Sequence, residues 1–169
     1  MLNIFRSVDF SNFVLDVDGV LTDGKIYTTP EGKLFKVFSA DDHEAIKILS
    51  QRIRISAVTA DFRGLAISTR RIVDEMGIDL ELISANERAA WIVDKFDSER
   101  TIYMGDGILD PHVFRRVKYS IAPANASRLT RKAANFVTSS RGGEGAVAEA
   151  CIHIANKLFH KGKSARLFE

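Results

Sequence analysis

Short apolar runs alternate along this chain with longer segments in which apolar residues recur at helical spacing. The runs have the length of buried strands, and they cover residues 13–17, 53–59, 80–84, 101–105, 119–122 and 136–138. Strands that alternate with helices form a parallel sheet whose two faces are covered by those helices. The pattern therefore predicts an α/β fold built on one parallel sheet.

The segments between the runs predict the helices. The first helix is expected to be capped by Asp41 or Asp42, because a carboxylate at this position accepts hydrogen bonds from the free amides of the first turn. Three apolar residues follow at the spacing of one helix face, Ala45, Ile46 and Leu49. The other helices are expected to end at Met76 before Gly77, to cover residues 86–96, to follow Pro111, to cover residues 126–134 and to run from the glycine-rich stretch 142–145 to about Phe159.

Residues 25–39 depart from this alternation. Two short β-rich runs flank Pro30-Glu31-Gly32, which is typical of a hairpin. An isolated two-stranded ribbon cannot bury many apolar side chains. The outer residues of this one are largely apolar, namely Ile26, Leu34, Phe35, Val37 and Phe38. We therefore predict a hairpin insertion that packs against other subunits.

The composition is that of an ordinary soluble domain, with 46% hydrophobic and 27% charged residues. The net charge of +2 is too balanced to favour binding to nucleic acid. No apolar run approaches the roughly 18 residues of a membrane helix, and the first residues lack the apolar core of a signal peptide. The single cysteine, Cys151, excludes an internal disulfide framework. We expect one cytoplasmic domain over residues 1–169 without nucleic-acid or membrane partners.

Polar residues stand where the predicted strands end. Asp16 and Asp18 close the first run, Thr59 closes the second and Asp106 follows the fourth. In parallel sheets, ligands bind outside the carboxyl ends of the strands. Carboxylates gathered there repel one another unless a cation intervenes, and a few oxygen ligands suit Mg²⁺. A metal ion and acids at this edge fit phosphoryl transfer.

Other interpretations of residues 16–24, DVDGVLTDG, fit the pattern less well. An Asp-Gly pair after a strand is often a simple turn. A calcium-binding EF-hand loop needs glycine at its sixth position, whereas Gly19 is fourth and Val20 is fifth. Polar residues stand at the ends of three predicted strands, and this coincidence favours a ligand-binding site over a simple turn.

The stretch DVDGVLTDG resembles the first motif of the haloacid dehalogenase superfamily of phosphatases. Its continuation into a hairpin and a helix, without an inserted cap domain, is similar to the 3-deoxy-D-manno-octulosonate 8-phosphate phosphatase family. Residues 142–151, GGEGAVAEAC, are similar to that family's G-G-x-G-A-V. The resemblance covers about Phe13 to Leu158. It implies a Rossmann-like, capless fold and a homotetramer.

The resemblance also implies an activity and catalytic roles. The activity would be Mg²⁺-dependent hydrolysis of a small phosphorylated sugar or sugar acid, such as 3-deoxy-D-manno-octulosonate 8-phosphate or a related nonulosonate 9-phosphate. Asp16 would be the nucleophile that forms an aspartyl-phosphate, and Asp18 would be general acid and then general base. Thr59 would donate a hydrogen bond to a phosphoryl oxygen. Arg88 would neutralise phosphate and nucleophile, because counting without gaps from Gly77 places it where the family has a lysine.

A metal site is implied by the same resemblance. The side chains of Asp16 and Asp106 and the backbone carbonyl of Asp18 would hold Mg²⁺. Asp110 matches the second acid of the family's motif and would lie near the metal. We expect the carboxylates of Asp16, Asp18 and Asp106 to form one acidic cluster at this edge of the sheet.

The chain departs from the family pattern at several positions. Arg88 replaces the usual lysine, and Asp61 stands where the family usually has an arginine that suits a substrate carboxylate. Gly107 replaces a common second aspartate, and Asp41-Asp42-His43 replaces Arg-Asp-Gly. These departures predict more acidic surroundings for the substrate. They motivate a second hypothesis, a catalytically weak domain of the same superfamily with an assembly or regulatory role; a phosphomutase or phosphotransferase is a third.

Two features have alternative interpretations. His43 either reaches the mouth of the site or is a partly exposed polar residue. The polar tail, residues 160–169, either is a flexible solubilising end or serves as a lid, since Lys161, Lys163 and Arg166 suit an anionic substrate.

Overall fold

The computed structural model describes residues 9–158, and its centre is a six-stranded, entirely parallel sheet. The strand order is β5-β4-β1-β6-β7-β8. The strands are β1 (Asn12–Asp16), β4 (Arg54–Thr59), β5 (Asp79–Leu82), β6 (Thr101–Met104), β7 (Tyr119–Ala122) and β8 (Phe136–Val137). All six predicted strands are confirmed, with ends that differ by one or two residues.

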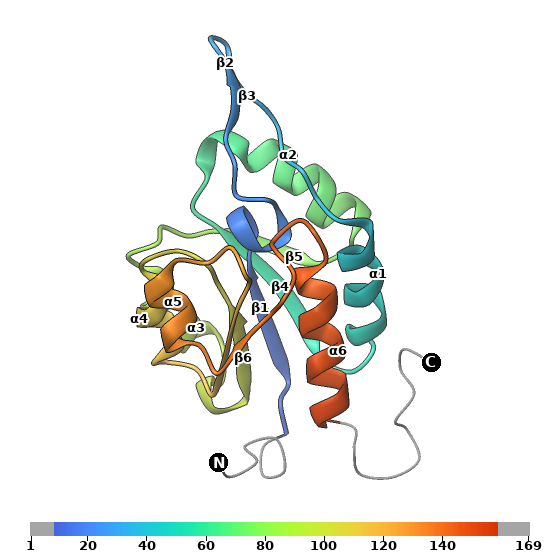
Figure 1. Ribbon diagram of the computed structural model, residues 1–169, viewed down its shortest axis with the longest axis vertical. Coiled ribbons are helices and arrows are strands. Elements are labelled where there is room, and N and C mark those ends of the chain that lie inside the picture. Colours follow the sequence, from blue (N-terminus) through green and yellow to red (C-terminus); the bar gives the residue numbers. More distant parts are fainter. Residues whose placement is uncertain (1–8, 159–169) are drawn as a thin grey trace.

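Helices cover both faces of this sheet (Figure 1). The helices are α1 (Ala40–Leu49), α2 (Leu65–Thr69), α3 (Arg88–Lys95), α4 (Asp110–Phe114), α5 (Arg128–Ala133) and α6 (Ala146–Leu158). Shorter helical turns occupy Val17–Leu21, Phe62–Gly64, Arg70–Glu75 and Ser98–Arg100. Helices α1 and α6 lie together on one face, and α3, α4 and α5 lie on the other. The predicted α/β, Rossmann-like fold is confirmed, and no cap domain is inserted among the described residues.

Strand β1 is buried on both faces, which explains its continuous apolar sequence. Phe13 and Leu15 are fully buried in the core beneath α1 and α6. Val14, which points to the opposite face, is buried in the second core beneath α3 and α4. Each such side chain contributes about 1.5 to 3 kcal/mol by leaving water. Strand β1 therefore holds its last residue, Asp16, rigidly at the carboxyl edge of the sheet.

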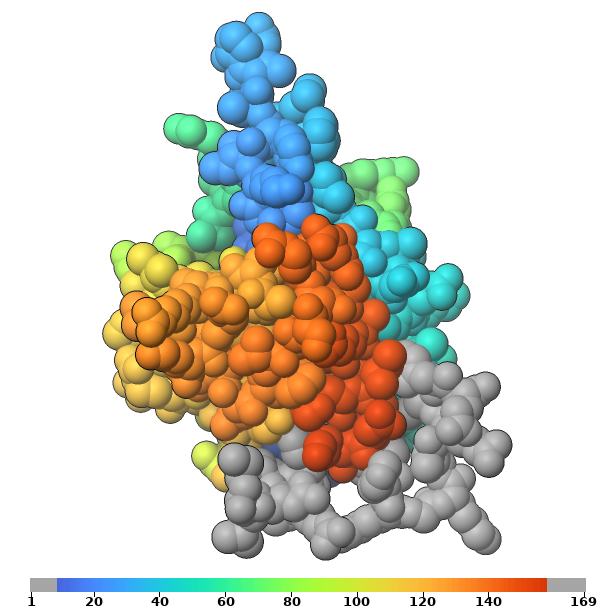
Figure 2. Space-filling view, in the orientation of Figure 1, coloured from blue at the N-terminus to red at the C-terminus, as the bar shows by residue number. Residues whose placement is uncertain are grey.

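The predicted hairpin is present as β2 (Tyr27–Thr29) and β3 (Gly32–Phe35), which pair antiparallel. It stands clear of the domain body (Figure 2). Four of its predicted outer residues are exposed, namely Ile26, Leu34, Phe35 and Val37. The expectation for Phe38 was wrong, because this ring packs against the core as the chain enters α1.

The capping prediction for the first helix was also wrong. Helix α1 begins at Ala40, and Ser39 precedes it without a side-chain cap. The buried carboxylate of Asp42 points across to α6, where its Oδ1 accepts a hydrogen bond of 2.8 Å from the amide of Ala148. Asp42 therefore caps the last helix of the described chain instead of its own.

None of the helices between residues 9 and 158 combines the length and the apolar composition needed to cross a bilayer. The tail that the sequence predicts at residues 160–169 lies outside the described residues.

Candidate active site

The site lies at the carboxyl edge of the sheet, where β1 ends in Asp16 and a helical loop, Val17–Leu21, turns the chain over that edge. Gly19 in this loop has φ of +96°, a conformation that favours glycine. A Cβ atom on Gly19 would also meet Asp106 Oδ2 at 2.1 Å. The loop therefore needs glycine at this position to bring Asp106 beside Asp16.

A neighbouring loop supports the backbone at Gly19. Asn125 Nδ2 donates to the Gly19 carbonyl at 2.8 Å, and the Gly142 amide donates to Asn125 Oδ1 at 2.6 Å. Sequence reasoning missed Asn125, because its partners are far away in the chain. The predicted glycine-rich stretch thus packs directly on the loop after Asp16.

Three carboxylates meet at this edge. Asp16, Asp106 and Asp110 each offer an oxygen within 4.8 Å of the others. Burial, opposed by Arg88 and reinforced by Asp110, raises the pKa of Asp16 to about 7. Burial and the charges of Asp16 and Asp110 raise the pKa of Asp106 to about 8. A divalent cation would relieve this repulsion, and the all-oxygen donor set suits Mg²⁺.

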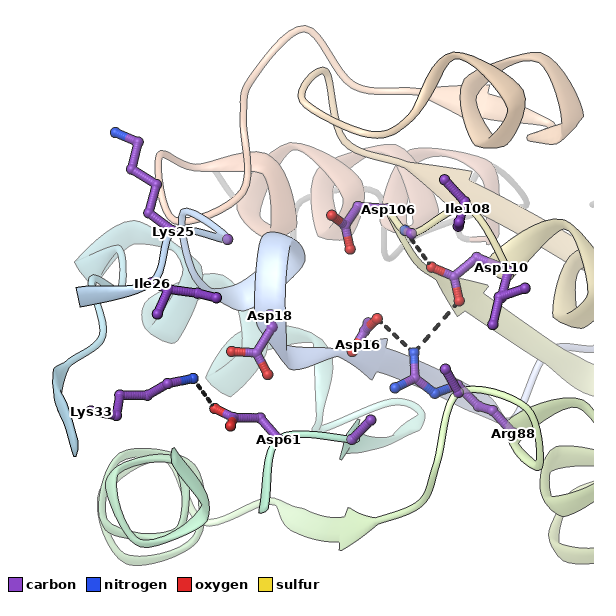
Figure 3. A pocket seen from close by; sticks show the side chains of 15 residues that line it. Asp16, Asp18, Lys25, Ile26, Lys33, Asp61, Arg88, Asp106, Ile108 and Asp110 are labelled. Carbon is purple, nitrogen blue, oxygen red and sulfur yellow. Dashed lines mark hydrogen bonds and ion pairs between the residues drawn. The ribbon is translucent and has the colours of Figure 1, made fainter. Parts of the chain in front are cut away.

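Arg88 lies beside this cluster, at the start of α3, as the count from Gly77 predicts. Its Nη1 atom lies 2.6 Å from Asp16 Oδ2 and 3.5 Å from Asp110 Oδ1 (Figure 3). The same atom donates to the Tyr103 hydroxyl at 3.0 Å, and that hydroxyl donates to Asp110 Oδ1 at 2.9 Å. Sequence reasoning missed Tyr103; the only signal was a hydroxyl in a buried strand, three residues before Asp106.

Asp18 lies near the cluster, but its side chain has different partners. Thr59 Oγ1 donates to Asp18 Oδ2 at 2.8 Å, and Lys36 Nζ lies 2.8 Å from Asp18 Oδ1. The expected trio of Asp16, Asp18 and Asp106 therefore needs correction, since Asp110 supplies the third clustered carboxylate. The reason is the loop after β1, which turns the Asp18 side chain toward β4.

The predicted acidity around Asp61 is offset by two lysines from the hairpin. Lys33 Nζ forms a short ion pair with Asp61 Oδ2, and Lys36 Nζ lies 2.9 Å from the same oxygen. Burial alone would raise the pKa of Asp61, but these ammonium groups lower it to about 2. Because Asp61 is neutralised by these lysines, it does not make the surroundings of the substrate more acidic, and this part of the expectation was wrong. Sequence reasoning missed both lysines, which it treated as part of an apolar ribbon.

The carboxylates of the site and Arg88 line a pocket of about 470 Å³ (Figure 3). Its floor is formed by Asp16, Asp106, Asp110 and Arg88, and Asp18 and Asp61 stand at its side. Lys25, Ile26 and Lys33 from the hairpin region and Ile108 from the loop after β6 line its rim, as does Gly107. His43 is half-buried and is absent from this lining, which favours the structural interpretation of that residue.

The site can hold a cation against buried carboxylates and can present Asp16 to an electrophile beside the positive charge of Arg88. Asp18, whose two carboxylate oxygens contact Thr59 and Lys36, faces the same pocket. A nucleophile, an acid–base group and a charge-neutralising shell are the components required for phosphoryl transfer.

Comparison with known proteins agrees with this geometry. The chain is 33% identical over 158 residues to the 3-deoxy-D-manno-octulosonate 8-phosphate phosphatase of Haemophilus influenzae, covering 90% of this chain and 84% of that protein. It is 30% identical over 161 residues to the phosphatase of the same name from Yersinia pestis, covering 88% and 81%. The resemblance predicted from the sequence is therefore confirmed.

A solved structure is similar over nearly the whole fold. The 3-deoxy-D-manno-octulosonate 8-phosphate phosphatase of Moraxella catarrhalis, in complex with magnesium ion, phosphate ion and KDO, superposes with a TM-score of 0.81 at 26% identity, covering 93% of each chain. The model of the haloacid dehalogenase-like hydrolases matches residues 28–151. This chain belongs to the haloacid dehalogenase-like hydrolase family.

Proposed function

We propose that this protein is a Mg²⁺-dependent phosphatase that hydrolyses a small phosphorylated sugar acid, such as 3-deoxy-D-manno-octulosonate 8-phosphate or a related nonulosonate 9-phosphate. The observation that carries the proposal is the meeting of Asp16, Asp106, Asp110 and Arg88 in one pocket. The similarity to phosphatases of that name supports the substrate class.

The residues present fit a magnesium ion. Asp16 and Asp106 would bind it through their side chains, the backbone carbonyl of Asp18 would add a third oxygen, and Asp110 would complete the acidic surroundings. The raised pKa values of Asp16 and Asp106 indicate that these two carboxylates are costly to ionise together without a cation. When bound, Mg²⁺ would neutralise charge on the phosphoryl group and help to orient it.

The chain's own residues would carry the covalent chemistry. A carboxylate oxygen of Asp16 attacks phosphorus, the new O–P bond forms and the ester P–O bond breaks. Asp18 gives its proton to the departing ester oxygen, which leaves as an alcohol. Asp18, now ionised, takes a proton from water, and that water hydrolyses the aspartyl-phosphate to release phosphate and regenerate Asp16.

Arg88 and Thr59 would stabilise the transferring group. The Arg88 guanidinium holds the Asp16 carboxylate at 2.6 Å and would meet the negative charge of the phosphoryl oxygens. Thr59 Oγ1 donates its single proton to Asp18 in this structure, and we propose that it donates this proton to a phosphoryl oxygen instead when substrate is bound. Both residues would thus act on charge that develops as the O–P bond forms.

The proposal is tested by phosphate release from a panel of sugar phosphates that includes eight- and nine-carbon 2-keto acids. We expect turnover that requires Mg²⁺, disappears with Asp16→Asn and is fastest with one of these acids. A folded protein with no Mg²⁺-dependent and Asp16-dependent turnover across the panel would contradict the proposal. That outcome would favour the second hypothesis, a catalytically weak domain kept for assembly or regulation.

The structure weakens the motives for that second hypothesis. Arg88 Nη1 lies 2.6 Å from Asp16 Oδ2, which supports a charge-neutralising role for this arginine, and Asp61 is neutralised by Lys33 and Lys36. Gly107 keeps a useful contact, since its amide donates to Asp110 Oδ2 at 2.7 Å. The departures from the family pattern therefore have compensating partners.

We also propose a homotetramer assembled through the hairpin insertion of residues 25–39, with residues 1–169 as one domain. The support is the set of exposed apolar side chains on that ribbon. A cytoplasmic location and a lid role for residues 160–169 stay predictions.

A further inference from the structure

Lys36 is a buried cation that follows the hairpin strand β3, and its side chain is only 2% exposed. Its Nζ atom lies 2.8 Å from Asp18 Oδ1, 2.9 Å from Asp61 Oδ2 and 2.8 Å from Ser68 Oγ. An ammonium group has three N–H donors, so these partners match its full capacity. Burying a charged group is costly unless it is fully paired, and Lys36 meets this condition.

The contact with Asp18 has a specific geometric effect. Lys36 holds one carboxylate oxygen of Asp18, and Thr59 holds the other at 2.8 Å. The Asp18 side chain is 35% exposed and faces the pocket, so without these two contacts it could turn freely in solvent. Proton transfer depends on the orientation of the donor group, because it requires hydrogen-bond reach to the reacting oxygen.

The structure assigns Lys36 as the positioning residue of Asp18, through which the hairpin takes part in leaving-group protonation. This inference rests on the proposed phosphatase function and adds to it a residue that does not touch the substrate, since Lys36 lies behind the pocket wall formed by Asp18 and Asp61. The effect on leaving-group protonation is assigned to the contact with Asp18, because the other pocket-lining partner of Lys36, Asp61, is shared with Lys33. The proton passes from Asp18 to the ester oxygen as the P–O bond breaks and the Asp16 O–P bond forms.

A positioning role can be separated from a structural role by changing the leaving group. Phenyl phosphate and 4-nitrophenyl phosphate have nearly the same shape, but the phenoxide is the more basic leaving group and depends more on protonation. We expect Lys36→Met to lower kcat/KM for phenyl phosphate about 10-fold more than for 4-nitrophenyl phosphate, which is a part of the roughly 10²- to 10⁴-fold that general acid catalysis supplies. A loss of folded protein alone would lower both values equally.

Lys33→Met is the matched control. It removes an ammonium group from the same hairpin that also pairs with Asp61 but, in contrast to Lys36, forms no ion pair with Asp18 among the described residues. The ratio of the two kcat/KM values should stay at the wild-type value in this variant. A changed ratio in Lys33→Met would mean that any hairpin charge alters the leaving-group dependence, and it would overturn the assignment.

The second arm combines substitutions. In an Asp18→Asn background the carboxylate that Lys36 positions is absent, so Lys36→Met should lower kcat/KM less than about 3-fold further. An additional loss as large as in the wild-type background would overturn the inference, as would an equal fall for the two aryl phosphates. Lys36→Gln, which keeps a hydrogen-bond donor, replaces the methionine variant if thermal melting shows that the latter does not fold.

The outcomes for the two proposals are distinct. If the wild-type protein releases no phosphate from either ester in Mg²⁺, the proposed function fails. If it turns over both esters and Lys36→Met leaves their ratio unchanged, only the role of Lys36 fails.

Discussion

At the scale of single residues, one nitrogen atom of Arg88 makes several of the contacts that hold the site together. Arg88 Nη1 contacts Asp16, Tyr103 and Asp110. A single nitrogen therefore makes all three contacts, as the ammonium group of a lysine would. The Arg88 Nε atom is buried and has no hydrogen-bond partner among the described residues. Part of the hydrogen-bonding capacity of the planar guanidinium group is therefore not used by the described residues.

We therefore expect Arg88→Lys to keep more activity than Arg88→Met. The lysine restores a cation near Asp16, whereas methionine leaves the buried carboxylates without this neighbouring cation, and the loss of kcat/KM should be about 10-fold in the first and at least 10²-fold in the second. Steady-state kinetics with 4-nitrophenyl phosphate in Mg²⁺ measures both values. Equal losses in the two variants would show that charge at Arg88 is irrelevant to the reaction.

The metal assignment makes a prediction for stability. Mg²⁺ binds the folded state, so it should raise the melting temperature, and the shift should grow with the logarithm of its concentration above the dissociation constant. Asp106→Asn should remove most of this shift, and Asp79→Asn, which changes an exposed carboxylate paired with Arg54, should keep it. Thermal melting with and without Mg²⁺ measures the shift; an Asp106→Asn variant that retains all of it would refute the assignment.

At the scale of elements, Asp42 joins the first helix to the last. It lies in α1 but accepts a hydrogen bond from the amide of Ala148 in α6. Burial raises its pKa to about 6, despite the backbone amides that favour the ionised form. The contact between α1 and α6 is therefore sensitive to pH.

The sign of this dependence follows from the numbers of protons bound. Between about pH 4 and pH 6 the folded state keeps the Asp42 proton and the unfolded state has released it, so the free energy of unfolding falls as the pH rises through this window. Asp42→Asn stays neutral at every pH. From pH 4 to pH 7 its stability relative to the wild type should rise by about 2 to 3 kcal/mol. Denaturant titrations at the two pH values test this, and a constant difference would contradict it.

Sequence reasoning succeeded where physical causes are local. The apolar run before Asp16 predicted a buried strand, and the position of Asp16, Thr59 and Asp106 at strand ends predicted a site at the sheet edge. It failed where a partner comes from elsewhere in the fold. Nothing near Asp42 indicates Ala148, and nothing near Lys36 indicates the carboxylate of Asp18, because these pairs form only when distant elements pack.

At the scale of the whole molecule, the hairpin exposes apolar side chains to solvent. Leu34 is 59% exposed, and Ile26 is 75% exposed. Such surface is typical of an interface between subunits. We expect the protein to sediment as a tetramer at micromolar concentration and Leu34→Glu to shift it toward smaller species. Sedimentation velocity measures the size of the assembly. Glu31→Gln at the polar hairpin tip is the control and should leave that size unchanged. A monomeric wild-type protein would disprove the assembly.

The central position of β1 has a consequence for biosynthesis. Among the strands that the structure describes, β1 leaves the ribosome before the others, yet both of its neighbours, β4 and β6, come much later in the chain. Its apolar residues therefore remain without a partner during most of translation, when non-local parallel pairing is slow and exposed strands are prone to aggregation. The loop at Gly142, which packs on Gly19, emerges later still. A nascent chain should thus depend on protection by chaperones, and its active site should form in a single late step.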